Sequence, residues 1–306
     1  MTRLPSLFAL ATVLIATPVS IEAQQGLGRD EAVFTWADRV AAGNWIRVYN
    51  FNGRIDVVEG SGPDVQVRAE KMMDEEDFGD VTFEVQRDAG GVTICAIHRE
   101  RAECDEDGLH QQSSSWWRDD GNRNAKVAIR ITVPARVNVR ARTGNGDLTA
   151  RRVGGEIDIR SGNGKVEVTE TAGRVVAHTG NGAVTVDRAG GPVDVRTGNG
   201  RITVVTASGP VVANTGNGEI DVTMNAIAGA DDMSFRTGNG DVTITLPPSI
   251  DADLELRTGH GTVSTDFPIT VNGRLNPRQL RGRLGKGGRS IRVTSGNGDI
   301  ELRRGS

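Results

Sequence analysis

The sequence predicts an all-β protein, a single-stranded β-solenoid (β-helix) with coils of about 18 residues and an N-terminal cap region. The first observation is a tetrapeptide, Thr/Ser-Gly-Asn-Gly, that recurs at regular spacing. It begins at Thr143, Ser161, Thr179, Thr197, Thr215, Thr237 and Ser295. The first four intervals are 18 residues each, and Thr258-Gly-His-Gly is a variant copy.

The second observation is that apolar and polar residues alternate between copies of this tetrapeptide. After the copy at Ser161, Val166 and Val168 form one alternating pair, and Val175 and Ala177 form the next, with a second glycine corner between the pairs. A period of two is typical of β-strands with one buried face. Each unit therefore predicts a strand, a glycine turn, a second strand and a GNG turn.

The third observation separates a solenoid from a sandwich of hairpins, the other fold that short strands at this spacing allow. No aromatic residue lies between Arg118 and Met233, which fits a thin interior of Val, Ile and Ala better than an ordinary globular core. Stacked coils also place equivalent residues in columns, so the motif asparagines can form an amide ladder. Its predicted members are Asn145, Asn163, Asn181, Asn199, Asn217, Asn239 and Asn297.

Three regions follow along the chain. Residues 1–23 have a basic Arg3, an apolar stretch over 7–19 and a small Ala23, as in a secretory signal peptide. No later run of about 20 apolar residues predicts a transmembrane anchor after cleavage. We therefore expect the mature protein to be extracytoplasmic, in the periplasm, or secreted to the cell surface.

Residues 24–142 are expected to form the N-terminal cap and irregular β coils, with a polar loop at 105–125. Residues 46–57 have the strand, Asn-Gly corner, strand pattern of a degenerate first coil. Residues 143–306 are expected to form the regular GNG-repeat β-solenoid, with an insertion near 264–290. Arg303 and Arg304 would protect the far end, and His260 would interrupt the asparagine ladder.

Cys95 and Cys104 are the only cysteines and lie nine residues apart. In an oxidising compartment this pair predicts a disulfide. A redox site would favour a C-x-x-C motif, which is absent, and a zinc site would need further ligands.

Charged residues occupy the outward columns beside the motif. Asp158 with Arg160, Asp194 with Arg196, and Glu255 with Arg257 can pair on one face. Two interpretations stay open: a solvated face neutralised by in-strand partners, and a stripe that recognises an anionic polymer. Repeat-bound calcium is excluded because the position after the motif is Lys165 in one coil and Arg201 in another.

The sequence contains no recognisable catalytic constellation. Its four histidines are scattered, and neither a nucleophile elbow, a zinc-protease motif nor a phosphate-binding loop is present. We therefore expect no enzyme activity, no catalytic residues, no cofactor and no metal. The formal net charge of −4 argues against a nucleic-acid partner. In loop 105–125, Trp116 and Trp117 form the candidate binding site, because exposed tryptophans often anchor partners.

The GNG units resemble the bacterial putative-adhesin family, a GNG β-strand-repeat domain of unknown function. Segments 46–57 and 285–302 are similar to parts of that family as well. The resemblance implies a non-enzymatic adhesin-like protein or an envelope scaffold, with a cell-surface glycan or an envelope protein as its partner. Two other hypotheses remain open: an envelope-sensing or regulatory protein-binding module, and a carbohydrate-active β-helix enzyme. The sequence leaves the oligomeric state open.

Overall fold

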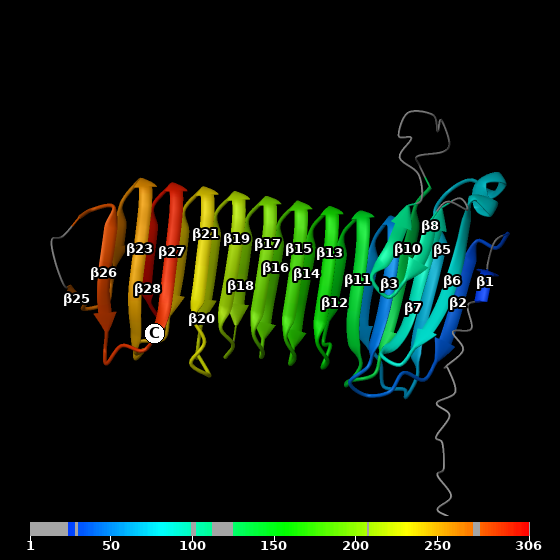
Figure 1. Ribbon diagram of the computed structural model, residues 1–306, viewed down its shortest axis with the longest axis horizontal. Coiled ribbons are helices and arrows are strands. Elements are labelled where there is room, and N and C mark those ends of the chain that lie inside the picture. Colours follow the sequence, from blue (N-terminus) through cyan, green and yellow to red (C-terminus); the bar gives the residue numbers. More distant parts are fainter. Residues whose placement is uncertain are drawn as a thin grey trace, which may run out of the picture.

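The chain forms a long rod in which two β-sheets face each other (Figure 1). The computed structural model describes residues 24–27, 30–98, 102–111, 125–206, 208–271 and 276–305. The predicted signal peptide and the tryptophans Trp116 and Trp117 lie outside these residues. Within them, the only helix is the short 3-10 helix η1 (Glu75–Asp80). The prediction of an all-β fold with long parallel sheets, consistent with a β-solenoid, is confirmed.

The first sheet, sheet A, has 14 strands. In spatial order they are β1 (Gln24–Leu27), β6 (Val81–Asp88), β7 (Gly91–His98), β3 (Trp45–Asn52), β11 (Asn138–Asn145), β13 (Ile157–Asn163), β15 (Val175–Asn181), β17 (Val193–Asn199), β19 (Val211–Asn217), β21 (Met233–Asn239), β27 (Arg289–Asn297), β23 (Ala252–His260), β26 (Gln279–Leu284) and β25 (Thr270–Val271).

The second sheet, sheet B, has 12 strands. They are β2 (Val33–Asp38), β5 (Val65–Lys71), β10 (Val127–Val133), β4 (Ile55–Glu59), β12 (Leu148–Arg151), β14 (Val166–Thr171), β16 (Val184–Ala189), β18 (Ile202–Thr206), β20 (Ile220–Met224), β22 (Val242–Leu246), β28 (Ile300–Arg304) and β24 (Val263–Thr265). A separate hairpin joins β8 (Ala102–Asp105) to β9 (Gly108–Gln111).

Each regular coil contributes one strand to each sheet, because the GNG corner turns the chain from sheet A into sheet B. Strands of successive coils pair in parallel, so that Val139 lies beside Ile157 and Ile157 beside Val175. The apolar residues of the alternating pattern point between the sheets, where Val168, Val175 and Val186 are fully buried. Burial of this apolar surface is the main stabilising contribution to the rod.

The GNG corners stack directly on one another through their backbones. The amide of Gly164 donates to the carbonyl of Asn181 at 2.9 Å, and the amide of Gly182 donates to Asn199 at 2.9 Å. Gly164 has φ +150°, and a Cβ there would lie 2.1 Å from the carbonyl oxygen of Gly146. This position therefore requires glycine for both its conformation and its lack of a side chain.

The first residue of each tetrapeptide contributes a buried hydroxyl to the same corner. Thr179 Oγ1 donates to the carbonyl of Gly164 at 2.9 Å, and Ser161 Oγ donates to that of Gly146 at 2.8 Å. The hydroxyl thus satisfies a backbone acceptor of the preceding coil, which explains why the position is Thr or Ser. The alternation of apolar and polar residues alone indicates no role for this column.

The C-terminal coil does not end the rod, which corrects our expectation for Arg303 and Arg304. β27 lies between β21 and β23 (Figure 1). In sheet B, β28 correspondingly lies between β22 and β24. In chain order, the coil made of β23 and β24 comes before β25 and β26, which lie beyond it in sheet A. The following strands β27 and β28 then lie between that coil and the coil made of β21 and β22. This is possible because β27 offers the same register to both neighbours: Asn297 lies beside Asn239 on one side and His260 on the other.

His260 therefore lies beyond the asparagine ladder, and our expectation that it interrupts the ladder is wrong. Asn297 Nδ2 donates to Asn239 Oδ1 at 2.6 Å. The backbone stacking nevertheless continues, since the amide of Gly298 donates to the carbonyl of His260 at 2.8 Å.

At the opposite end of the rod the strands change from parallel to antiparallel pairing. β5 pairs antiparallel with both β2 and β10, and β6 pairs antiparallel with β1 and β7. Phe34 of β2 stacks on Phe83 of β6, with ring centroids 4.3 Å apart. These larger side chains occupy the space between the sheets where the regular Val and Ala columns stop.

The stacking of the GNG corners predicts that any side chain at Gly164 lowers the stability of the fold. We expect Gly164→Ala to lower the free energy of unfolding by about 2 kcal/mol or more, because the new methyl group meets backbone and φ is unfavourable. Gly62→Ala is the matched control, since Gly62 is exposed with no atom within 4 Å of the added Cβ; it should change stability by less than about 0.5 kcal/mol. Urea unfolding followed by circular dichroism measures both, and equal effects would contradict the stacking argument.

Candidate functional site

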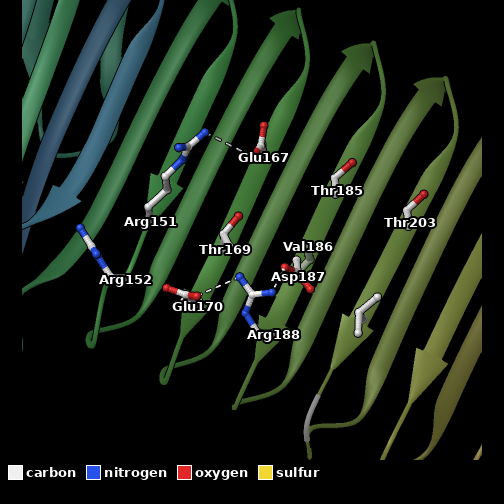
Figure 2. A pocket seen from close by; sticks show the side chains of 11 residues that line it. Arg151, Arg152, Glu167, Thr169, Glu170, Thr185, Val186, Asp187, Arg188 and Thr203 are labelled. Carbon is white, nitrogen blue, oxygen red and sulfur yellow. Dashed lines mark hydrogen bonds and ion pairs between the residues drawn. The ribbon is translucent and has the colours of Figure 1, made fainter.

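The candidate site is an open groove of about 600 Å³ on the outer face of sheet B. It crosses four consecutive strands, β12, β14, β16 and β18, where the alternation points polar side chains outward (Figure 2). The lining residues are Arg151, Arg152, Glu167, Thr169, Glu170, Thr185, Val186, Asp187, Arg188, Thr203 and Val205. Three arginines and three carboxylates thus face the groove together with threonine hydroxyls.

Three of these charged residues adopt an unusual backbone conformation. Arg152, Glu170 and Arg188 occupy equivalent positions in successive coils and have φ between 53° and 56°. A non-glycine residue pays a conformational cost in this left-handed region. The turn sends the next residue back into the interior, and Val153 and Ala189 are fully buried there. The same turn places the three charged side chains along the edge of the groove.

Most of the groove's charges are paired with one another. Arg188 contacts Glu170 at 2.8 Å and Asp187 at 2.6 Å, and Arg151 lies 3.4 Å from Glu167 (Figure 2). Among the residues that the structure describes, Arg152 has no ion-pair or hydrogen-bond partner for its side chain. The carboxylates are engaged by arginines, and the lining set contains no His, Cys or Ser. This arrangement can bind polar groups but offers no pair of nucleophile and base.

The outer face of sheet A carries the charged stripe that the sequence predicted. Arg160 Nε donates to Asp158 at 2.8 Å, and Arg196 donates to Asp194 at 3.0 Å. The third predicted pair is wrong. Glu255 binds Arg281 at 2.7 Å and Arg292 at 3.0 Å instead of Arg257, because the neighbouring strands β26 and β27 place guanidinium groups on both sides of it.

His178 lies in the middle of this stripe, between Arg160 and Arg196. Burial lowers the pKa of the imidazole; Asp194, 3.6 Å away, acts in the opposite direction, and the two arginines lower the pKa further. The protonated ring is therefore disfavoured in the folded protein.

The predicted disulfide is present between Cys95 and Cys104. It fixes the β8–β9 hairpin to β7 on the outer face of sheet A. The hydroxyl of Tyr49 donates to the carbonyl of Glu106 at 2.8 Å, and Arg142 donates to that of Asp107 at 2.8 Å. The start of loop 105–125 is thus anchored at three points, while the candidate residues Trp116 and Trp117 lie outside the described residues.

The asparagines predicted to form a ladder are brought together at the exposed GNG edge. Asn163 donates to Asn145 at 2.8 Å, Asn181 to Asn163 at 2.8 Å, and Asn199 to Asn181 at 2.7 Å. The series continues through Asn217, Asn239 and Asn297. Each amide between the two ends of the series both donates and accepts, so the ladder links the coils along one edge.

Neither a metal centre nor a membrane helix is seen in the part of the chain that the structure describes. No group of three His, Cys, Asp or Glu side chains there is placed to hold a metal ion. No helix there is long and apolar enough to cross a membrane.

The asparagine ladder predicts that removing one side-chain amide lowers the stability of the folded protein. Asn181→Ala removes one donated and one accepted hydrogen bond, and we expect it to lower the unfolding free energy by about 1 kcal/mol, since both bonds are exposed. Asn225→Ala, at an exposed asparagine outside the ladder, is the control. Thermal unfolding measures both; a ladder variant as stable as the control would show that the bonds contribute nothing.

The lowered pKa of His178 predicts a dependence of stability on pH. As the pH falls through the ordinary histidine pKa of about 6.5, the unfolded chain takes up a proton before the folded one does. Stability therefore decreases over this range and levels off below the folded pKa. His178→Asn should reduce this decrease, since Asn214 already occupies the equivalent column position two coils away. Unfolding midpoints at pH 7.5 and pH 5 test this, and an unchanged pH dependence would contradict it.

The family model described as Toastrack DUF4097 matches residues 110–303. No curated protein matches the chain. Among solved structures, the chain is similar to a putative cell adhesion protein from Clostridium sporogenes, at 12% identity and a TM-score of 0.30, covering 94% of this chain and 100% of that one.

Two further solved structures are similar over most of their length. A putative lipid binding protein from Parabacteroides distasonis is 10% identical, with a TM-score of 0.43 and coverage of 92% of this chain and 98% of that one. A putative adhesin from Parabacteroides merdae is 9% identical, with a TM-score of 0.37 and coverage of 90% and 96%. Because the family model spans well over half of the chain, including the GNG units that predicted the resemblance, the chain belongs to the Toastrack DUF4097 family.

Proposed function

We propose that this chain is a non-enzymatic, extracytoplasmic rod of the bacterial cell envelope that acts as an adhesin-like or scaffold module. The observation that carries the proposal is the groove on sheet B, a polar surface built on four rigid parallel strands. Most of its side chains lie on strands, which hold them at fixed spacing, as a binding surface requires. The disulfide between Cys95 and Cys104 supports an oxidising compartment.

The chemistry of the groove favours an acidic glycan as its ligand. Sugar hydroxyls can donate to Glu167, Glu170 and Asp187 and can bond with the threonines between them. The guanidinium of Arg152, which has no partner among the described residues, can take a sugar carboxylate in a bidentate contact. Successive coils place the equivalent positions of the groove about 4.8 Å apart, which suits an extended polymer.

The glycan proposal is tested with Arg152→Glu. Glu170 occupies the same conformation one coil away, so the fold tolerates this side chain at such a turn. We expect the variant to bind a purified acidic envelope polysaccharide roughly tenfold more weakly, since it loses one charged contact and gains a repulsion. Arg174→Glu, at an exposed arginine that does not line the groove, is the control for net charge. Equal binding by the two variants, measured by calorimetry, would reject the groove as the site.

Localisation separates the adhesin-like role from the scaffold role. Cleavage of the protein by protease on intact cells would support a surface adhesin. Protection until the outer envelope is opened would support a periplasmic scaffold.

Incubation with the same polysaccharide, followed by assay for new reducing ends, tests the enzyme alternative, for which we expect no product.

A second candidate function is a protein-binding module that acts through loop 105–125. The anchoring of the β8–β9 hairpin by the disulfide, Tyr49 and Arg142 favours it, because a rigid base lowers the entropic cost of binding. Replacement of Trp116 and Trp117 by Ala would then abolish capture of an envelope protein and leave glycan binding unchanged.

A further inference from the structure

The inserted C-terminal coil creates a basic patch on the outer face of sheet A at one end of the rod. We define this basic patch as Arg236 on β21, Arg292 on β27, Arg257 on β23, and Arg281 and Arg283 on β26. These strands are neighbours, so five guanidinium groups lie on four adjacent strands. Two carboxylates, Asp253 and Glu255, share the same face.

The two carboxylates neutralise only part of the basic patch. Glu255 accepts hydrogen bonds from both Arg281 and Arg292, and these bonds lower the pKa of its carboxyl group. Asp253 accepts one from Arg283 at 3.2 Å. Arg236 and Arg257 are exposed, and neither has a hydrogen bond or ion pair from its side chain among the residues that the structure describes.

Arg236 and Arg257 flank one threonine on the outer face of sheet A. In the register of sheet A, Arg236 lies beside Thr294, and Thr294 lies beside Arg257. The two arginines are thus two strand spacings apart, roughly 10 Å, with a threonine hydroxyl between them. Long arginine side chains can lean toward each other over that hydroxyl. Without the insertion of β27, neither Thr294 nor Arg292 would belong to this face.

The donor set fits phosphate better than carboxylate. A carboxylate has only two acceptor oxygens, and on the same surface Glu255 uses one for Arg281 and the other for Arg292. Two guanidinium groups and one hydroxyl offer more hydrogen-bond donors than the two oxygens of a carboxylate can accept. The oxygens of a phosphate group are numerous enough to accept from all of them. The exposed large apolar residues Phe51 and Met72 belong to the N-terminal strands and the segment after β5, so the patch offers charge without a hydrophobic anchor.

The charge distribution along the chain directs anions to this end. Residues 267–298 contain seven basic side chains and no acidic one, whereas residues 24–126 contain 21 acidic and 12 basic ones. Strands of these two segments lie at opposite ends of the rod (Figure 1). A separation of charge on this scale steers an anionic partner toward the basic end.

We propose that the basic patch is a phosphate-binding site, with Arg236, Thr294 and Arg257 as its primary contacts. The phosphate groups come from a lipid headgroup or from a phosphate in solution, two sources with the same chemistry. The site is independent of the proposed glycan groove, which lies on sheet B.

The test compares two double variants of equal net charge. R236E/R257E reverses the two unpaired arginines of the patch. R136E/R174E reverses two exposed arginines in turns outside the basic patch and is the matched control. Binding is measured by sedimentation with phosphatidylcholine vesicles, with and without phosphatidylglycerol, and by calorimetry with soluble polyphosphate. Thermal unfolding shows that each variant is folded.

We expect the wild-type chain and the control to bind a phosphate probe with salt-dependent affinity, and the patch variant to bind roughly tenfold or more weakly. Binding to phosphatidylglycerol vesicles alone would identify the headgroup as the source, and competition by polyphosphate would identify a soluble phosphate; both support the site. Arg152→Glu should bind the phosphate probes as the wild type does, because Arg152 lies in the groove on sheet B. Failure of the glycan proposal can therefore be told apart from failure of the phosphate proposal. The proposal is overturned if the wild type binds neither probe, if the control loses as much as the patch variant, or if a polycarboxylate binds as tightly as polyphosphate.

Discussion

The backbone contact between successive GNG corners is the constraint on which the structure depends. The amide of the motif's final glycine donates to the carbonyl of the asparagine in the neighbouring coil, or of His260 in the outermost one, and the glycines approach so closely that no side chain fits between them. This contact sets the coil spacing and the register at once. The threonine or serine hydroxyl, the asparagine ladder and the apolar columns all repeat at the interval that it imposes.

The same constraint makes the coils interchangeable, and the C-terminal coil shows the consequence. Since every unit presents an equivalent edge, β27 can pair with β21 and β23 in one register. The last segment of the chain therefore completes the interior of the rod, and an earlier segment covers its end. The coil is held on both sides, which buries Ile291 and Val293 between neighbours rather than leaving them at an open edge.

The regular interior leaves the outer faces to carry what is particular to this chain. On sheet B, left-handed turns at Arg152, Glu170 and Arg188 line up charged side chains beside a groove. On sheet A, an acidic and disulfide-anchored hairpin lies near one end and the basic patch lies at the other. The rod therefore has chemically different faces and ends on one regular interior.

The sequence by itself determined the all-β class, the alternation that decides which residues are buried, the pairing of Cys95 with Cys104 and the family resemblance. These are local or strictly periodic signals, and a period of two or of 18 residues is visible without a structure. Only the tertiary structure decided that β27 enters between β21 and β23, that Glu255 binds Arg281 and Arg292, and that a groove follows the left-handed turns. The physical reason is that near-identical units pair with one another equally well, so the local sequence does not determine which unit stacks on which. The order of stacking depends on the whole chain, and it brings charged residues that are distant in sequence onto one surface.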